Sequence, residues 1–295
     1  ISLKMEYETV GNFKEDGYTI IKKIIPDQRI NSLIQNIAKL YYKFSNEIDS
    51  EIEKLEEPFN HNIFHQKLIN FRKEKPELFG AIYDSLKTSV ALNQIIMDDL
   101  VIENISKFLN VTPSELSISE PMCRLDVPED KRNILSWHQE RSFFPQNRDG
   151  LKGLVSWIPL SDVDEEMGTI HICPKSHEEG FLEPKIEKKE NLLYTTQIPV
   201  PEEKIKKYED VIIPLEKGDA VFFNMLLFHR SGVNISNKIR FAIQGRFHTM
   251  TSNDFIPFDF INYYNPFIKQ KLEETFGETD IPNNIRQPPV AQKWK

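Results

Sequence analysis

The second half of the chain constrains the fold most, because short strand-like segments follow one another there without helices between them. Beyond residue 111, apolar or alternating runs are separated by glycine, proline and polar turn residues. These runs cover residues 121–127, 135–140, 153–160, 168–173, 210–215, 219–223 and 239–247. Many short strands without alternating helices are typical of a sandwich, a jelly roll or a barrel.

The first half of the chain has a helical pattern instead. Pro26 and Asp27 open a stretch in which apolar residues return at helical spacing, at Ile30, Leu33, Ile34, Ile37 and Leu40. Similar spacing continues to about residue 109. We therefore expect a single domain over residues 1–295, with mainly helical support at 12–110 and a β core at 111–250. A C-terminal helix and tail would follow at 251–295.

A charged stretch at residues 181–210 interrupts the predicted β core. It is too polar to be buried, and two interpretations remain open. It is either a solvated excursion or a lid over the mouth of the barrel, since long insertions of this kind often carry function.

Composition excludes several classes of protein. The hydrophobic fraction of 39% and charged fraction of 28% indicate a folded chain rather than a disordered one. The net charge of −8 disfavours broad attraction to nucleic acid or to anionic membranes. We expect Cys123 and Cys173 to be reduced core thiols. No apolar run reaches the roughly 20 residues of a membrane helix, and the first residues lack a signal core, so we expect a cytoplasmic protein.

The residues His138-Gln139-Glu140 suggest a metal site. If residues 135–140 form a strand, His138 and Glu140 project from one face while Gln139 points away. An imidazole and a carboxylate are two of the three ligands of a 2-His-1-carboxylate iron site. The third ligand is best sought in the apolar run 219–229, which ends in His229. The alternative is that both histidines are satisfied core residues of the barrel.

Several motifs fall in an order that resembles the phytanoyl-CoA dioxygenase family of iron(II)/2-oxoglutarate-dependent oxygenases. The resemblance runs from about Asn12 to Met250. Its motifs are His138-Gln-Glu140, Phe144-Pro145, Trp157-Ile-Pro-Leu160, Gly168-Thr-Ile, Pro174-Lys-Ser-His177, Gly218-Asp219, His229-Arg-Ser231, Asn234 and Arg240.

The resemblance implies a fold, a metal and a cosubstrate. The fold would be mainly β with α: a double-stranded β-helix, like a jelly roll or cupin, with N-terminal helices packed on one sheet. His138, Glu140 and His229 would be the catalytic ligands of Fe(II). Arg240, eleven residues past His229, would pair with the far carboxylate of 2-oxoglutarate, with Ser231 beside that carboxylate and Trp157 near the cosubstrate.

Each of these residue types suits that chemistry. Three ligands on one face of an octahedral iron leave three positions open, and the guanidinium of arginine pairs with a buried carboxylate through two donors. The family usually has Asp where this chain has Glu140. The extra methylene moves the carboxylate by one C–C bond, about 1.5 Å, which puts the geometry of the open positions in question.

We therefore expect a non-haem iron oxygenase and hydroxylase that acts on a small polar metabolite and converts 2-oxoglutarate to succinate and CO2. Its partners would be this substrate and O2, with no nucleic acid and no membrane. The alternatives are a cupin-type metal enzyme without 2-oxoglutarate and a non-catalytic binding protein on the same fold. Basic residues near the metal motif indicate an anionic substrate or, equally well, a solvated rim: Arg124, Arg141, Arg148 and Lys152.

The other histidines are expected to lie outside the metal site. His61 and His65 have the spacing of a helical metal pair but lack an acidic partner. His171 and His177 are interpreted as structural, and His248 as a surface or interface residue.

Overall fold

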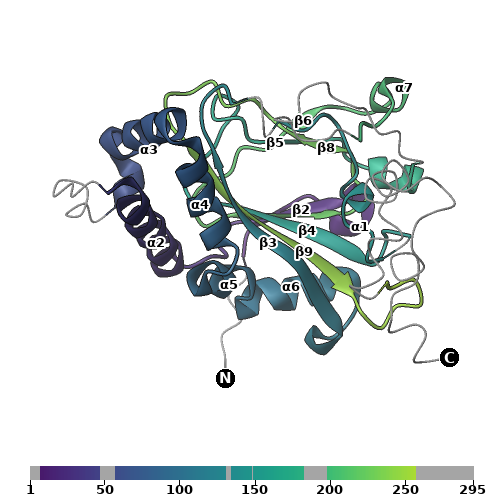
Figure 1. Ribbon diagram of the computed structural model, residues 1–295. Coiled ribbons are helices and arrows are strands. Elements are labelled where there is room, and N and C mark those ends of the chain that lie inside the picture. The colour runs from purple at the N-terminus through teal and green to yellow at the C-terminus, as the bar shows by residue number, and fades with distance from the viewer. Residues whose placement is uncertain (1–6, 47–56, 131–133, 148, 183–197, 257–295) are drawn as a thin grey trace, which may run out of the picture.

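The computed structural model describes residues 7–46, 57–130, 134–147, 149–182 and 198–256 (Figure 1). Its α-helices are α1 (Phe13–Asp16), α2 (Asp27–Ser45), α3 (Asn62–Glu74), α4 (Pro76–Leu86), α5 (Val90–Ile96), α6 (Asp99–Leu109) and α7 (Glu202–Ile205). Its strands are β1 (Thr9–Val10), β2 (Tyr18–Ile21), β3 (Leu116–Asp126), β4 (Gly153–Pro159), β5 (Ile170–Ile172), β6 (Val211–Ile212), β7 (Ala220–Asn224), β8 (His229–Ser231) and β9 (Arg240–Thr249).

These strands form two antiparallel sheets. The larger has the order β1-β2-β7-β4-β9-β3, and the smaller has the order β6-β5-β8. Figure 1 shows the small sheet as a separate layer beside the larger one, with α2 to α5 gathered at the other side. The expectation of a mainly β fold with N-terminal helices packed on one sheet is confirmed.

The two faces of the large sheet bury different sets of side chains, because successive residues of a strand point to opposite faces. On β4, Leu154 and Ile158 join the core shared with the helices. Their neighbours Val155 and Trp157 join the core that the small sheet shares through Ile170 and others. The space between the two sheets is therefore a second, separate core, and the metal motif lies at its margin.

The helices obey the pattern expected from the sequence. In α2 the apolar stripe is buried as predicted, at Ile30, Leu33, Ile34 and Ile37. Two of the later helices begin at side-chain caps: Ser89 accepts a hydrogen bond from Leu92 N, and Asp98 accepts one from Leu100 N. These caps fix where α5 and α6 start beneath the sheet.

The turn before β7 is held by Gly218 and Asp219. Gly218 has a φ of +92°, which favours glycine, and it lies against the backbone of Ile25. The buried carboxylate of Asp219 accepts hydrogen bonds from the backbone N–H of Lys23 and the ammonium of Lys22. Asp219 is thus a structural anchor between β2 and β7.

Two predicted regions lie wholly or partly outside the described residues. Of the stretch 181–210, the structure describes 181–182 and 198–210, where α7 lies. The predicted C-terminal helix lies outside the described residues. Within the described chain, no helix is long and apolar enough to cross a membrane. Cys123 and Cys173 are both buried and free, as expected.

Candidate metal centre

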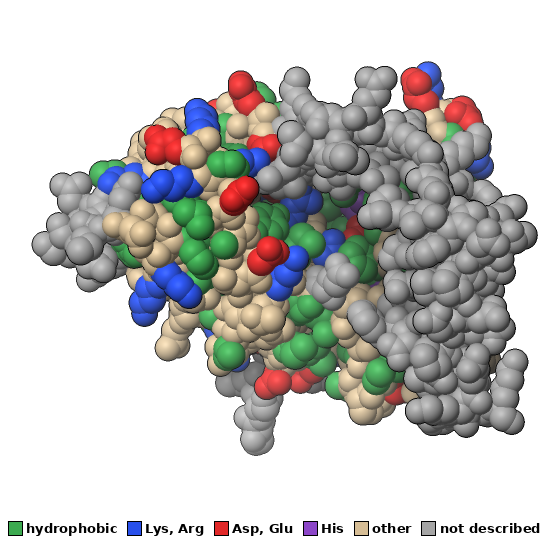
Figure 2. Space-filling view, viewed as in Figure 1, with side chains coloured by type: hydrophobic (Ala, Val, Ile, Leu, Met, Phe, Trp, Pro, Cys, Tyr) green, Lys and Arg blue, Asp and Glu red, His purple; other side chains and the backbone are tan. Residues whose placement is uncertain are grey.

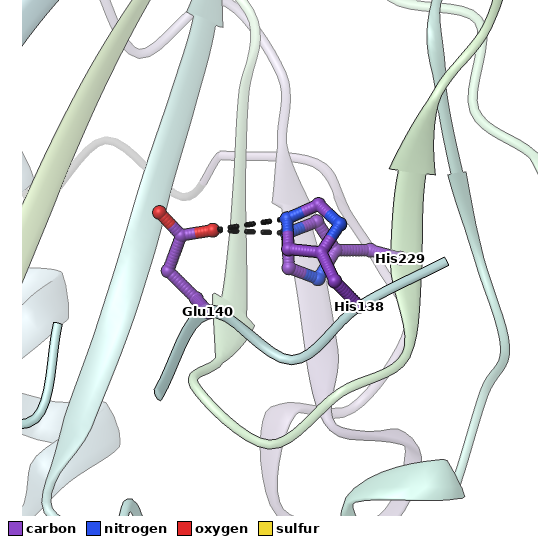
Figure 3. Close-up of side chains that lie close together, drawn as sticks. All are labelled: His138, Glu140 and His229. Atoms are coloured by element: carbon purple, nitrogen blue, oxygen red, sulfur yellow. Dashed lines mark hydrogen bonds and ion pairs between the residues drawn. The ribbon is translucent and has the colours of Figure 1, made fainter. Parts of the chain in front are cut away.

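Three buried side chains converge at the edge of the inter-sheet core. Oε2 of Glu140 lies 3.4 Å from Nε2 of His138 and 3.1 Å from Nε2 of His229. All three ligand atoms lie within 4.8 Å of one another. Figure 3 shows both imidazole rings turned toward the same carboxylate oxygen. The structure therefore brings together the three residues that the sequence proposed as metal ligands.

The backbone achieves this in a way the sequence did not predict. Residues 135–140 are not a strand: His138 forms only an isolated antiparallel bridge with His229. The two residues exchange backbone hydrogen bonds of 3.0 and 3.2 Å. Glu140 then begins a short 3-10 helix, Glu140–Ser142. The carboxylate thus reaches the histidines from a helical turn, and the expectation of alternation along a strand was wrong.

Hydrogen bonds at the far ring nitrogens orient both histidines. Nδ1 of His138 lies 2.8 Å from the carbonyl oxygen of Ser136, and Nδ1 of His229 lies 2.9 Å from that of Leu227. A carbonyl only accepts, so each Nδ1 carries the proton and donates it. Each Nε2 is left with a lone pair directed at the Glu140 side. This is the arrangement that a metal-binding histidine requires, so the donor set fits a divalent ion.

The charge states of the three groups also suit a metal. Burial by itself would raise the pKa of Glu140, but the neighbouring guanidinium of Arg246 holds that pKa well below its usual range. Burial, reinforced by His138, lowers the pKa of His229. Near neutral pH the site therefore presents an ionised carboxylate and a neutral His229, the protonation states that metal binding needs.

Gln139, between the two ligands of the motif, points away from the site and binds three backbone groups. Its amide nitrogen donates to the carbonyl oxygens of Gly180 and Leu226, each at 2.8 Å. Its amide oxygen accepts from the backbone N–H of Leu182 at 2.9 Å. Every hydrogen-bonding group of this side chain type is engaged, so Gln139 ties the ligand-bearing segment to two neighbouring loops.

Arg240 lies in a buried charged cluster. Its Nη2 donates to Oδ2 of Asp126 at 2.6 Å, and Asp126 also binds Arg124 at 3.1 and 3.2 Å. Burial would raise the pKa of Asp126, but Arg124 and Arg240 lower it to about 2. Nε and Nη1 of Arg240 are buried and have no hydrogen-bond partner among the described residues. Two unpaired guanidinium donors fit a carboxylate ligand, because an unsatisfied buried donor is costly.

Ser231 and Trp157 lie near this cluster in different ways. Ser231 and Arg240 line one small cavity, together with Gly232 and Asn234. Trp157 lies on the inter-sheet face of β4 and packs in the same core as Ala242. The pairing of Trp157 with Gln244 places it further along β9 than Arg240.

Two other histidines occupy structural positions, as expected. His65 is buried, with Nε2 2.8 Å from the carbonyl oxygen of Phe59, whereas His61 is exposed, so the two form no metal pair. His171 contacts Asp210 at 2.8 Å on the outer side of the small sheet.

His248 corrects an expectation. It was interpreted as a surface residue, yet it is 1% exposed and its Nε2 lies 2.9 Å from Oγ of Ser119. The strand β9 continues to Thr249, so His248 is still inside the sheet rather than beyond it.

The basic residues predicted near the motif are distributed unevenly. Arg124 is buried beside Asp126, and Arg141 is buried with its guanidinium 4.3 Å from the ring centre of Phe181. Lys152 is exposed, and Arg148 lies outside the described residues. Figure 2 shows a histidine near the middle of this face, with acidic and basic side chains around it.

One residue of the site was missed by sequence reasoning. Arg246 donates from Nε to Oε1 of Glu140 at 2.7 Å. It is six residues beyond Arg240 on the same strand, so the period of two places both on one face. The alternation along this strand could have indicated that Arg246 faces the same side as Arg240.

Comparison with known proteins agrees with this geometry. The family model described as Phytanoyl-CoA dioxygenase (PhyH) matches residues 13–242. The human peroxisomal phytanoyl-CoA dioxygenase is 22% identical over 244 residues, which cover 80% of this chain and 66% of that protein. The mouse protein is 31% identical over 118 residues, covering 37% and 32%. The chain thus spans just under two thirds of the human relative's length.

Solved structures share the fold. The epimerase SnoN, in complex with Fe3+, alpha ketoglutarate and nogalamycin RO, superposes with a TM-score of 0.54 at 15% identity, covering 80% of each chain. EvdO2 from Micromonospora carbonacea var. aurantiaca, complexed with 2-oxoglutarate, gives a TM-score of 0.54 at 18% identity, covering 85% of this chain and 97% of that one.

Proposed function

The chain belongs to the phytanoyl-CoA dioxygenase family, and from that premise we propose that it is a non-haem iron(II) oxygenase that uses 2-oxoglutarate as its cosubstrate. The observation that carries the proposal is the convergence of His138, Glu140 and His229, with both Nε2 lone pairs directed at the carboxylate side. Two histidines and a carboxylate are the facial set of non-haem Fe(II) oxygenases.

The iron would supply O2 chemistry coupled to decarboxylation of 2-oxoglutarate to succinate and CO2, with hydroxylation of a C–H bond of the substrate. The protein supplies ligands of fixed orientation and a site that is buried from water. His138 and His229 are held by backbone carbonyls, so neither ring has to turn when the ion binds. All three ligand residues are at most 5% exposed, which limits access of water to the ion.

Arg240 would bind the far carboxylate of 2-oxoglutarate. Two of its buried donors have no partner among the described residues, which supports this role. Asp126 would keep the guanidinium oriented through Nη2. Trp157 would pack beside the cosubstrate from the core between the two sheets. A cupin-type enzyme without 2-oxoglutarate has no carboxylate to bind at Arg240, so the unpaired donors disfavour that alternative.

The substrate would be a small polar metabolite that carries negative charge. Buried cations outnumber buried anions in the described part of the site: Arg124, Arg240 and Arg246 face Asp126 and Glu140. The far carboxylate of 2-oxoglutarate would offset the charge at Arg240, and the further buried cation Arg141, next to Glu140 in the chain, supports an anionic substrate. Equal turnover of neutral and anionic analogues would contradict this part of the proposal.

Uncoupled turnover tests the proposed function directly. Purified protein with Fe(II), 2-oxoglutarate and O2 is expected to form succinate slowly even without substrate. Protein without iron, and protein with 2-oxoglutarate replaced by pyruvate, serve as controls. If the protein binds Fe(II) but forms no succinate, the alternative of a binding protein is favoured over the oxygenase.

A further inference from the structure

Arg246 contacts the carboxylate oxygen of Glu140 that does not face the two histidines. Nε of Arg246 donates to Oε1 of Glu140 at 2.7 Å. Arg246 is 5% exposed and Glu140 is 4% exposed, so water screens this charge-assisted hydrogen bond little. Such a bond restricts how the carboxylate can turn.

The bond divides the two oxygens of the carboxylate between two tasks. Oε2 faces the Nε2 atoms of His138 and His229, at 3.4 and 3.1 Å, whereas Oε1 faces Arg246. To bind a metal through both oxygens, Glu140 would have to share Oε1 between the metal and the cationic Arg246, which repels a metal ion. The geometry therefore favours binding through Oε2 alone.

Arg246 is itself fixed by two neighbours. Its Nη2 donates to Oε1 of Gln244 at 2.8 Å, on the same face of β9. Its guanidinium lies 4.3 Å from the ring centre of Phe144, a cation–π distance. The backbone N–H of Phe144 donates to the carbonyl oxygen of Glu140 at 3.0 Å, so the same short segment carries the ligand and the ring.

We propose that Arg246 is a positioning residue that holds Glu140 as a metal ligand through one oxygen and so keeps the remaining coordination positions open for 2-oxoglutarate and O2. This inference rests on the proposed function. Glutamate has one more rotatable bond than aspartate, and its carboxylate reaches about 1.5 Å further. Arg246 removes that freedom, so Glu140 and Arg246 act as a matched pair.

The test measures binding of Ni(II) to the full chain by calorimetry, without turnover. Arg246→Gln is expected to weaken Ni(II) binding by about 10- to 100-fold, the range for partners that orient metal ligands. Arg246→Lys keeps the charge but loses the planar fork, and it is expected to lie between wild type and Arg246→Gln. Arg72→Gln, on α3, removes an ion pair of 3.4 Å with Asp130 that does not touch the metal ligands, and it is the control, expected to bind Ni(II) as wild type does.

A double-mutant cycle with Glu140→Asp shows whether the two residues act together. The shorter Asp cannot reach both the metal position and Arg246, so Arg246→Gln is expected to change Ni(II) affinity by less than about threefold in that background. Binding of 2-oxoglutarate to the Ni(II)-loaded Arg246→Gln protein is also expected to weaken, because Glu140 can then occupy a second coordination position.

The outcomes separate this inference from the function on which it rests. If wild type binds no divalent metal, the proposed metal centre fails. If wild type binds Ni(II) and Arg246→Gln binds it equally well, or loses affinity equally in both backgrounds, the positioning role is overturned while the metal centre stands. Circular dichroism checks folding, and where Arg246→Gln does not fold, the same comparisons are made with Arg246→Lys.

Discussion

The backbones of His138 and His229 are hydrogen-bonded to each other in both directions, with N–H···O distances of 3.0 and 3.2 Å, and their ring centres lie 4.1 Å apart. Two residues far apart in sequence are thus joined by backbone as well as by the metal that we propose between them. The bridge does not depend on the imidazoles, so it should survive their removal.

Replacing either histidine should therefore abolish metal binding without unfolding the protein. His138→Ala and His229→Ala are each expected to weaken Ni(II) binding by more than about 100-fold, beyond the effect typical of a ligand's orienting partner. Calorimetric titration measures this loss. His171→Ala, on the outer side of the small sheet, should bind Ni(II) as wild type does. Unchanged binding in His229→Ala would remove that residue from the ligand set.

Arg240→Ala should raise the 2-oxoglutarate concentration needed for uncoupled succinate formation. Loss of the buried partner of a carboxylate costs about 3–5 kcal/mol, or roughly 100- to 4,000-fold in affinity. Ni(II) affinity should change little, since Arg240 contacts Asp126 rather than a metal ligand. An unaltered dependence on 2-oxoglutarate would assign the unpaired donors of Arg240 to another ligand.

Glu140→Ala should lose most uncoupled turnover, because two protein ligands then hold the ion and Arg246 loses its carboxylate. Glu140→Asp should retain measurable Ni(II) binding, since a carboxylate remains at the site. Succinate formation and Ni(II) titration on the same preparations separate the two effects. Wild-type turnover in Glu140→Ala would show that the carboxylate is not a ligand.

His248 should make stability depend on pH. Burial, then Arg246, lowers its pKa to about 3, and the other charges acting on it are Glu140, Arg141 and Asp254. The unfolded state, with an ordinary pKa of about 6.5, binds the proton first as pH falls. This contribution to stability is complete above about pH 6.5 and is lost toward about pH 3, by up to about 1.4 kcal/mol per pH unit.

Urea denaturation of wild type and His248→Gln between about pH 7 and about pH 5 checks this prediction. Gln can keep a hydrogen bond to Ser119 but does not titrate, so the variant should lose less stability over that range. His65 and His229 also have lowered pKa values and remain in both proteins, which makes the difference between them the relevant quantity. Identical slopes would mean that His248 does not titrate as described.

Sequence patterns predicted the parts of this structure that depend on local periodicity. The apolar stripe of α2 and the alternation along β9 are local properties, and the second places Arg240, Ala242 and Gln244 on one face. The conformation of the segment around His138 could not be predicted from local periodicity. Its conformation depends on the bridge to His229 and on the bonds of Gln139, both of which join residues distant in the sequence.

Two errors concern polar residues inside a strand. Arg246 and His248 have the residue types of a solvated surface, and only the tertiary structure supplies the partners that allow burial: Glu140 for Arg246 and Ser119 for His248. A buried charge or imidazole is acceptable where such partners exist. Their identity is not encoded in the pattern of the strand that carries them.

The three hydrogen bonds of Gln139 bear on attempts to transplant this site into another scaffold. A designer who grafts His-x-Glu onto a barrel, and treats the middle position as free, would copy two ligands. The hydrogen bonds from that middle position to Gly180, Leu182 and Leu226 would be lost. Since residues 138–140 are not part of a strand, the grafted segment would be a loop without fixed hydrogen bonds, and its two ligands would adopt many conformations. The transferable unit is the motif together with the two loops that its central amide binds.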